Sequence, residues 1–231
     1  MPVEWWLDES EYAGEEHLDE EYVAGYDEKA QVDPSDDVRR LIDLGLGQDS
    51  VLVDMGAGTG VFALAAAETG ASVVAVDVSR AMVDVIRDRA EESGLDNITV
   101  VRAGFLSYDH ALDPADFVYT RNALHQLPDF WKVIALHHLA SFTRSGGYLL
   151  FRDLVFDLQP DEVEEGIVDW MAGAVDDPAK GFTEQDLAEH VRNEFSTYTW
   201  VLEPMLERCG FEILERDSRR KAYGTYLCRK T

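Results

Sequence analysis

Residues 51–61 read VLVDMGAGTGV, an apolar run that ends in an acid and then breaks into three glycines at alternate positions. An apolar run of this length is typical of a strand that is buried on both faces. A glycine turn after such a strand lets a ligand approach the backbone closely, and the helix that follows offers free N–H groups and a partial positive charge. The stretch therefore predicts a strand, a ligand-binding turn and the start of a helix.

Short β-rich runs alternate with helical patterns along most of the chain. The runs are VLVDM (51–55), SVVAVD (72–77), ITVVRA (98–103), DFVYT (116–120) and YLLFRD (148–153). The segments between them show helical periodicity, as in RAMVDVIRDRAEESG, with glycines just past their ends. Strands that alternate with helices predict a mostly parallel, doubly wound sheet of the α/β class.

The end of the chain breaks this alternation. Only SRRK separates the β-rich runs at 211–217 and 222–229, which is too short for a crossover helix, so we expect an antiparallel hairpin. The two cysteines, Cys209 and Cys228, have no metal-ligand or CxxC spacing and are interpreted as packed, reduced thiols. A disulfide stays open as the alternative, because the hairpin could bring the two thiols face to face.

Two stretches lie outside the alternation of strands and helices. Residues 1–32 are acidic and aromatic, and residues 154–200, between the fifth strand and the last helix, also carry several aromatic side chains. Open α/β sheets bind ligands beyond the carboxyl ends of their strands, where loops cover the site. We therefore expect one domain over residues 33–231, with 1–32 as a lid segment and 154–200 as a helical insertion over the substrate site.

The charge of the chain is extreme, because 20 lysines and arginines face 46 acids and the formal net charge is −26. Carboxylates recur along the whole chain, which indicates a solvated surface that repels itself. This composition resembles that of proteins from halophilic organisms; the alternative is an acidic surface for a cationic partner. No apolar run is long enough to span a bilayer and the acidic start is unlike a signal peptide, so we expect a cytoplasmic protein without a membrane partner.

The spacing of the glycine loop disfavours two phosphate-binding motifs. A dinucleotide fingerprint needs a third glycine at the sixth position from Gly56, and a P-loop needs lysine after Gly60; Val61 stands at both places. Asp77 is the first polar residue after the second buried strand, beside the loop. A carboxylate there can accept hydrogen bonds from both hydroxyls of a ribose, so we predict ribose binding.

Four motifs together resemble those of a known family. VDMGAGTG, VVAVDVS, DFVYTRNALHQLPD and SGGYLL look like the motifs of the class I S-adenosylmethionine-dependent methyltransferases, over about residues 34–153. The resemblance implies a seven-stranded, Rossmann-like sheet with an antiparallel C-terminal strand. It also implies S-adenosylmethionine as the cofactor and S-adenosylhomocysteine as its product.

The same resemblance implies which residues hold the cofactor: the glycine loop the methionine moiety, Asp77 the ribose, and the residues after the second strand the adenine. The implied residues are Asp54, Gly56, Ala57, Gly58, Gly60, Asp77, Val78, Met82, Gly104, Phe105 and Asn122. One position departs from the family pattern. Where the family commonly has an acid for the adenine amino group, this chain has Phe105, which either stacks on the adenine or belongs to the core.

Polar residues just past the fourth and fifth strands are candidates for the reacting centre. His125 follows the fourth strand within about one helical turn, so we predict that it lies beside the methyl group, either as a neutral base or as a capping residue. Further substrate or lid candidates are Tyr22, Tyr26, Lys29, Arg121, Arg152, Asp153, Tyr198 and Trp200. His137 and His138 are adjacent on a predicted helix and cannot face the same way, and no metal site is expected.

Three functions remain compatible with the sequence. The first is methylation of a small-molecule acceptor, which the aromatic insertions favour. The second is methylation of RNA or protein; its only local hint is the run Arg219-Arg220-Lys221, which a solvated turn explains more simply, and the negative chain would repel a nucleic acid at low salt. The third is a protein that binds the cofactor without transferring methyl. The acceptor atom and the oligomeric state stay open.

Overall fold

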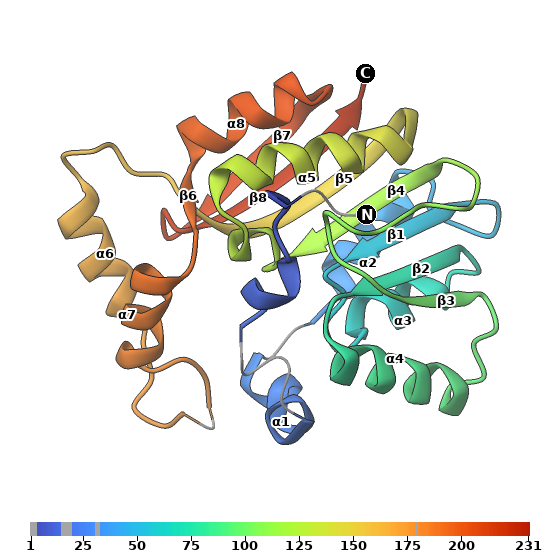
Figure 1. The fold of residues 1–231 in the computed structure, drawn as a ribbon, viewed down its shortest axis with the longest axis horizontal. Helices are drawn as coiled ribbons and strands as arrows, with labels where there is room; N and C mark the ends of the chain where they lie inside the picture. The colour runs from blue at the N-terminus through green and yellow to red at the C-terminus, as the bar shows by residue number, and fades with distance from the viewer. Residues whose placement is uncertain (1–3, 15–19, 31–32, 179) are drawn as a thin grey trace.

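The structure is a computed structural model that describes residues 4–14, 20–30, 33–178 and 180–231. Its centre is one twisted sheet with the strand order β3-β2-β1-β4-β5-β8-β7 (Figure 1). The strands on this path are β1 (Val51–Met55), β2 (Ser72–Asp77), β3 (Ile98–Arg102), β4 (Ala115–Arg121), β5 (Thr143–Phe156), β7 (Phe211–Arg219) and β8 (Tyr223–Lys230). The first five pair in parallel, and β8 runs antiparallel to both β5 and β7. The predicted α/β class and the antiparallel C-terminal strand are confirmed.

Helices cover both faces of the sheet. The helices of the sheet region are α2 (Ser35–Asp43), α3 (Val61–Ala67), α4 (Arg80–Glu92), α5 (Asp129–Phe142) and α8 (Thr199–Arg208). Two large apolar clusters explain this layering: α5 and α8 pack on one face of the sheet, and α2 and α3 on the other (Figure 1). Alternate residues of β1 enter opposite clusters, Leu52 the second and Val53 the first. A strand that is buried on both faces must be apolar throughout, which is why β1 and β2 could be recognised in the sequence.

The strand predicted at the position of β5 is shorter than the observed one. The expected strand covered residues 148–153, whereas β5 runs from Thr143 to Phe156 and pairs beyond Asp153 with a short added strand, β6 (Thr197–Tyr198). Backbone pairing with β6 and with the start of β8 keeps the last residues of β5 extended. The hairpin turns at Arg220 and Lys221, which both have positive φ angles of 54° and 52°, and the structure has Cys209 and Cys228 as free, buried thiols.

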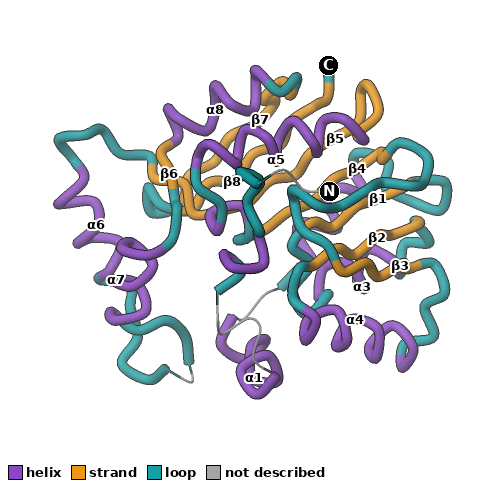
Figure 2. Tube along the Cα trace, viewed as in Figure 1, coloured by secondary structure: helices purple, strands orange, loops and turns teal. Residues whose placement is uncertain are grey.

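The two stretches outside the alternation lie on the side where β4 and β5 end. The first contains the short helix η1 (Glu9–Tyr12) and α1 (Glu20–Ala30); the second contains α6 (Val163–Met171), α7 (Glu184–Asn193) and β6, joined by long loops (Figure 2). Residues 154–200 thus include a strand as well as helices. Buried Phe156, Leu158, Trp170 and Leu187 form a small core of their own with Ala222 of the hairpin. None of the described helices is long and apolar enough to cross a bilayer.

Candidate functional site

Three cavities open at the carboxyl ends of the strands. The glycine-loop cavity, of about 720 Å³, lies between the ends of β1, β2 and β3 and the N-terminal segment. The Asp54 cavity lies behind the glycine loop, and the arginine cavity lies between β4, β5 and the β7–β8 turn. Arg121 and Asn122, at the end of β4, line all three cavities. Ligands that occupy different cavities would therefore meet at this strand end.

Each glycine of the loop answers a different steric demand, and all three have positive φ angles that favour glycine. A Cβ at Gly56 would overlap the Cβ of Ala123, so this glycine permits the close approach of the β4 end. A Cβ at Gly58 would meet no heavy atom within 4 Å, because this residue faces the glycine-loop cavity. Gly60 lines none of the three cavities; its Cβ would lie 2.9 Å from Cγ1 of Ile86, so α4 packing explains it.

Asp77 lies in the wall of the glycine-loop cavity at the end of β2. Its Oδ2 accepts a hydrogen bond from the Gly58 N–H at 2.8 Å, and its Oδ1 accepts one from the Ser79 N–H at 2.8 Å. These bonds fix the carboxylate against the glycine loop. Each carboxylate oxygen can accept a further hydrogen bond. The geometry therefore fits a diol donor such as a ribose.

Asp54 is a buried acid in the wall of the Asp54 cavity. It is 2% exposed, and its Oδ2 has no hydrogen-bond partner among the described residues. Burial, followed by the negative charge of Asp77, raises the pKa of this carboxyl group well above its usual range, against a backbone hydrogen bond from Ala63. A positively charged ligand with N–H donors relieves both costs. The ammonium group of S-adenosylmethionine supplies both the charge and the N–H donors, and its sulfonium adds positive charge only.

The expected adenine residues also converge on the glycine-loop cavity. Val78, Met82, Gly104 and Phe105 all line it, and Phe105 is only 6% exposed. Phe105 also belongs to the large apolar cluster on the α5 face, so it is both a core residue and part of the cavity wall. Apart from Gly60, every residue that the sequence assigned to the cofactor lines the glycine-loop or the Asp54 cavity.

Glu9 of η1 is a cavity residue that the sequence did not single out. It is 8% exposed, its Oε1 accepts from Ser107 Oγ at 2.6 Å, and its Oε2 accepts from the Leu106 N–H at 3.0 Å. Burial raises the pKa of this carboxyl group, and the hydrogen bonds oppose the shift. Gly104 leaves room for it, because a Cβ there would overlap the carboxylate. An acid thus stands beside the end of β3 after all, supplied from about 95 residues upstream.

The arginine cavity, of about 1290 Å³ and partly open to solvent, is lined by more basic than acidic residues, and four of the basic ones, Lys29, Lys180, Arg121 and Arg152, pair with carboxylates outside the lining. Six of the 20 basic residues line it, against two of the 46 acids. The basic residues are Lys29, Arg121, Arg152, Lys180, Arg219 and Arg220. Among the described residues no carboxylate pairs with Arg219 or Arg220. Two cations in this acidic chain therefore remain available to an anion.

Asp37 of α2 holds the inner arginines of this cavity, and no sequence pattern pointed to it. Arg152 donates from Nη1 to both oxygens of Asp37 at 2.7 and 2.6 Å, and Arg121 lies 3.8 Å away. Tyr119 donates its hydroxyl to Asp37 Oδ2 at 2.8 Å. Because Asp37 is 4% exposed, this network anchors the arginines at the strand ends.

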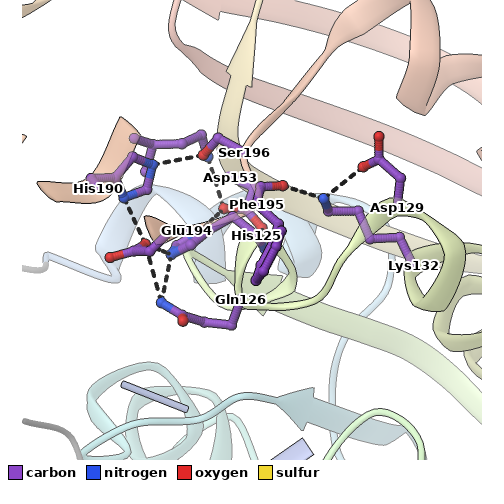
Figure 3. A network of polar contacts seen from close by, with 10 residues as sticks. His125, Gln126, Asp129, Lys132, Asp153, His190, Glu194, Phe195 and Ser196 are labelled. Carbon is purple, nitrogen blue, oxygen red and sulfur yellow. Dashed lines mark hydrogen bonds and ion pairs between the residues drawn. The ribbon is translucent and has the colours of Figure 1, made fainter. Parts of the chain in front are cut away.

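The structure corrects the premise that His125 is a neutral base. Its Nδ1 hydrogen-bonds the Asp153 carboxylate, and its Nε2 lies 3.0 Å from Oε2 of Glu194 (Figure 3). Burial would lower the pKa of His125, but the two carboxylates outweigh burial and raise it to about 10. The imidazole is therefore charged at neutral pH, both nitrogens are engaged, and His125 lines none of the three cavities. It holds the segment after β4 to β5 and to the end of α7.

The remaining candidates divide into cavity residues and outer residues. Tyr26 lines the glycine-loop cavity, whereas the side chain of Tyr22 lies outside the described part of the chain. Lys29 and Asp153 line the arginine cavity. Tyr198 and Trp200 line none of the three cavities; their rings stack on each other at 5.2 Å, and Trp200 is 49% exposed. Tyr198 ends β6 and packs against the small core of Phe156 and Trp170, and Trp200 lies in the first turn of α8.

A family model described as a methyltransferase domain matches residues 52–147. An uncharacterized methyltransferase from Geobacillus thermodenitrificans is 26% identical over 191 residues, which cover 83% of this chain and 82% of the relative. The methyltransferase GfsG from Streptomyces halstedii is 28% identical over 169 residues, which cover 71% of this chain and 53% of the relative.

Solved structures share the fold at low sequence identity. The magnesium protoporphyrin IX methyltransferase ChlM from Synechocystis PCC 6803, with bound SAM, has a TM-score of 0.67 at 15% identity and covers 99% of this chain and 100% of its own. A SAM dependent methyltransferase from Aquifex aeolicus has a TM-score of 0.63 at 17% identity and covers 92% of this chain and 99% of its own.

Proposed function

We propose that this chain, which is a class I S-adenosylmethionine-dependent methyltransferase, transfers a methyl group to a small, negatively charged acceptor held in the arginine cavity. One observation carries the proposal: the cavity that adjoins the cofactor site is basic, while the chain as a whole carries a formal charge of −26. The overall negative charge of the chain cannot explain why basic residues gather in this cavity. An anionic ligand explains it directly.

The cofactor-binding roles form the first part of the proposal. Asp54 and the loop of Gly56, Ala57 and Gly58 would hold the methionine moiety, and Asp77 the ribose. The unpaired Asp54 oxygen and the wall position of Asp77 support these roles. Glu9 would accept a hydrogen bond from the adenine amino group. The family commonly has an acid at the position of Phe105, and the carboxylate of Glu9 lies beside the neighbouring Gly104 instead.

Alignment is the main contribution that these residues can make to the reaction. S-adenosylmethionine supplies an activated methyl group, so the protein must hold the acceptor in line with it and exclude water. Asn122 has a φ of 50°, a strained angle for a residue other than glycine, and its N–H donates to the Arg152 carbonyl at 2.9 Å. This pairing fixes the backbone where the three cavities meet. An acceptor that is already ionised needs no general base, in agreement with the charged state of His125.

The two rival functions make different demands on the same surface. An RNA or protein acceptor would need an extended basic face, but these six basic residues line a cavity. A protein that only binds the cofactor would not need a second basic cavity that shares Arg121 and Asn122 with the first. The small anionic acceptor uses both cavities.

Label transfer tests this proposal. The protein is incubated in concentrated KCl with methyl-labelled S-adenosylmethionine and either total RNA, a protein extract or a metabolite extract that anion exchange has split into anionic and neutral fractions. We expect label in the anionic metabolites only, and less of it with the Asp77→Ala variant when the cofactor is below saturation. Label in RNA or protein would overturn the small acceptor, label in neutral metabolites would overturn its charge, and no label in any fraction would favour the binding protein.

A further inference from the structure

A cluster of side chains that could bind a metal lies between the segment after β4 and the end of α7 (Figure 3). Oε2 of Glu194 lies 3.0 Å from Nε2 of His125 and 2.6 Å from Nδ1 of His190. One ligand atom from each residue falls within 4.8 Å of the other two. His190 and Glu194 follow His125 by 65 and 69 positions in the chain, so no linear motif announces the cluster.

The far side of each imidazole is held by another residue. Nδ1 of His125 hydrogen-bonds Asp153, and Nε2 of His190 hydrogen-bonds Ser196 Oγ at 2.7 Å. Partners of this kind orient the rings of metal-binding histidines and direct the other nitrogen to the ion. Here both inward nitrogens point at the same carboxylate oxygen of Glu194.

A fourth ligand stands at the open side of the cluster. The Gln126 amide nitrogen lies 3.1 Å from both His125 Nε2 and Glu194 Oε2. The nitrogen and oxygen of such an amide can exchange places by a half turn of the group. After that half turn an amide oxygen, which is a metal ligand, would face the two imidazoles and the carboxylate.

We propose that His125, His190 and Glu194, with the amide oxygen of Gln126, bind a divalent cation of the zinc class. Two imidazole nitrogens with oxygen ligands suit Zn²⁺ or Co²⁺, whereas Mg²⁺ and Ca²⁺ prefer oxygen ligands alone. Zn²⁺ bonds of about 2.0–2.1 Å in a tetrahedron put neighbouring ligand atoms about 3.3 Å apart. The contacts at 2.6 and 3.0 Å would open slightly when an ion replaces the shared protons.

The surroundings supply the negative charge and the access that a cation needs. Asp153 faces His125, and Glu194 keeps 27% of its side chain exposed, which leaves an entry path. The cation Lys132 is directed elsewhere: its Nζ donates to Asp129 Oδ1 at 2.8 Å and to the Phe195 carbonyl. The ion would fasten the end of α7 to the segment whose Gln126 lines the glycine-loop cavity. Its role is to position that segment, independently of which acceptor is methylated.

Metal titration of the purified full chain tests this site without any methyl transfer. The protein is stripped with chelator, dialysed into concentrated KCl with excess Mg²⁺ to saturate weak surface carboxylates, and titrated with Co²⁺. We expect one equivalent of Co²⁺ with the strong visible absorption of a low-coordinate nitrogen and oxygen site, and its displacement by Zn²⁺. Zn²⁺ should also raise the Tm of the stripped protein.

Variants place the ion at this cluster. Glu194→Gln and His190→Gln should weaken Co²⁺ binding at least 100-fold, and Asp153→Asn by about 10- to 100-fold because it orients His125. His137→Gln is the matched control, since His137 is exposed on α5, and it should bind like the parent. If the parent takes up no stoichiometric Co²⁺, shows only the weak absorption of a hydrated ion, or binds as well after Glu194→Gln, the cluster is held by protons alone. The parent titration decides even where a variant does not fold.

Discussion

The glycine-loop cavity and the arginine cavity adjoin at the end of β4 but are built in different ways. The first takes half of its wall from the ends of β1, β2 and β3 and the segments that follow them, and the rest from the N-terminal segment and the end of β4; its two carboxylates are those of Glu9 and Asp77. The second takes its wall from α1, the ends of β4 and β5, the α6–α7 loop and the β7–β8 turn. Contiguous motifs at three strand ends supply the cofactor-binding residues of the first cavity, whereas the basic residues of the second come from segments dispersed along the chain.

The difference follows from what each ligand contacts. A ligand bound by backbone N–H groups and strand-end acids needs glycines and an acid at fixed spacing, so its site is written in contiguous motifs. A ligand bound by long side chains needs only that their tips converge, and residues as far apart as Lys29 and Arg220 can do that. The cofactor can therefore be recognised from the sequence, whereas the charge of the acceptor is visible only in three dimensions.

The largest expected effect concerns the His125 clamp, meaning the buried ion pairs of His125 with Asp153 of β5 and with Glu194 at the end of α7. In chelator-treated protein, His125→Gln leaves Asp153 buried without its charged partner and should lower the free energy of unfolding by about 3 to 5 kcal/mol. Affinity for S-adenosylhomocysteine should change little, because His125 lines neither the glycine-loop cavity nor the Asp54 cavity. Denaturant unfolding and calorimetry measure the two quantities. A variant as stable as the parent would show that the clamp is misassigned.

The same clamp predicts a pH dependence of stability. The pKa of His125 is raised on folding from 6.5 to about 10. Because the folded-state pKa is the higher one, the stabilisation is complete below about pH 6.5 and is lost as the pH rises toward 10. Unfolding curves between pH 6 and pH 10 should show this loss in the parent and lack it in His125→Gln. An equal loss in both would assign it to other groups.

The next effect is confined to the glycine-loop cavity. Asp77→Ala removes the acceptor for the ribose hydroxyls and should weaken S-adenosylhomocysteine binding by roughly 1 to 3 kcal/mol. Calorimetry measures the loss. The control is Asp109→Ala, a change at an exposed aspartate outside the three cavities, which should bind like the parent. Preferential binding of NAD by the parent would contradict the cofactor assignment.

A smaller effect is confined to the arginine cavity. Replacing Arg219 and Arg220 together with alanine should raise the KM for the anionic acceptor about tenfold or more, since two charge-assisted contacts are lost. Affinity for S-adenosylhomocysteine should stay at the parent value. Arg208→Ala, an exposed arginine on α8 outside the three cavities, is the matched control. If the double variant weakens the cofactor instead of the acceptor, the division into two cavities fails.

The smallest effect concerns Glu9, the residue of the glycine-loop cavity that lies outside the contiguous motifs. Glu9→Gln keeps an oxygen for Leu106 and Ser107 but removes the charge, so it should reduce cofactor affinity by about threefold to tenfold, or roughly 1 kcal/mol. The parent should also prefer S-adenosylhomocysteine over its inosine analogue, which lacks the amino group, and the variant should lose part of that preference. Competition binding measures both; an unchanged preference would return Glu9 to a purely structural role.

Part of the candidate site was predictable because its signals are local. VLVDM and SVVAVD matched β1 and β2 at both ends, since a doubly buried strand shows as an uninterrupted apolar run. The positions of Gly56, Gly58 and Asp77 at the cavity also follow from the turn after each strand. Gly60 belongs to the same motif, but its reason is the packing of Ile86, which spacing could not show.

By itself the sequence determined the α/β class, the antiparallel terminal hairpin and the glycine turn at the first strand, because each depends on neighbouring residues and on hydrophobic periodicity. Only the tertiary structure decided the charge of His125, the place of Glu9 beside Gly104 and the convergence of the arginines on one cavity. These features depend on burial and on distances between segments far apart in the chain. A pKa or a cavity wall is a property of such surroundings, and no single segment contains them.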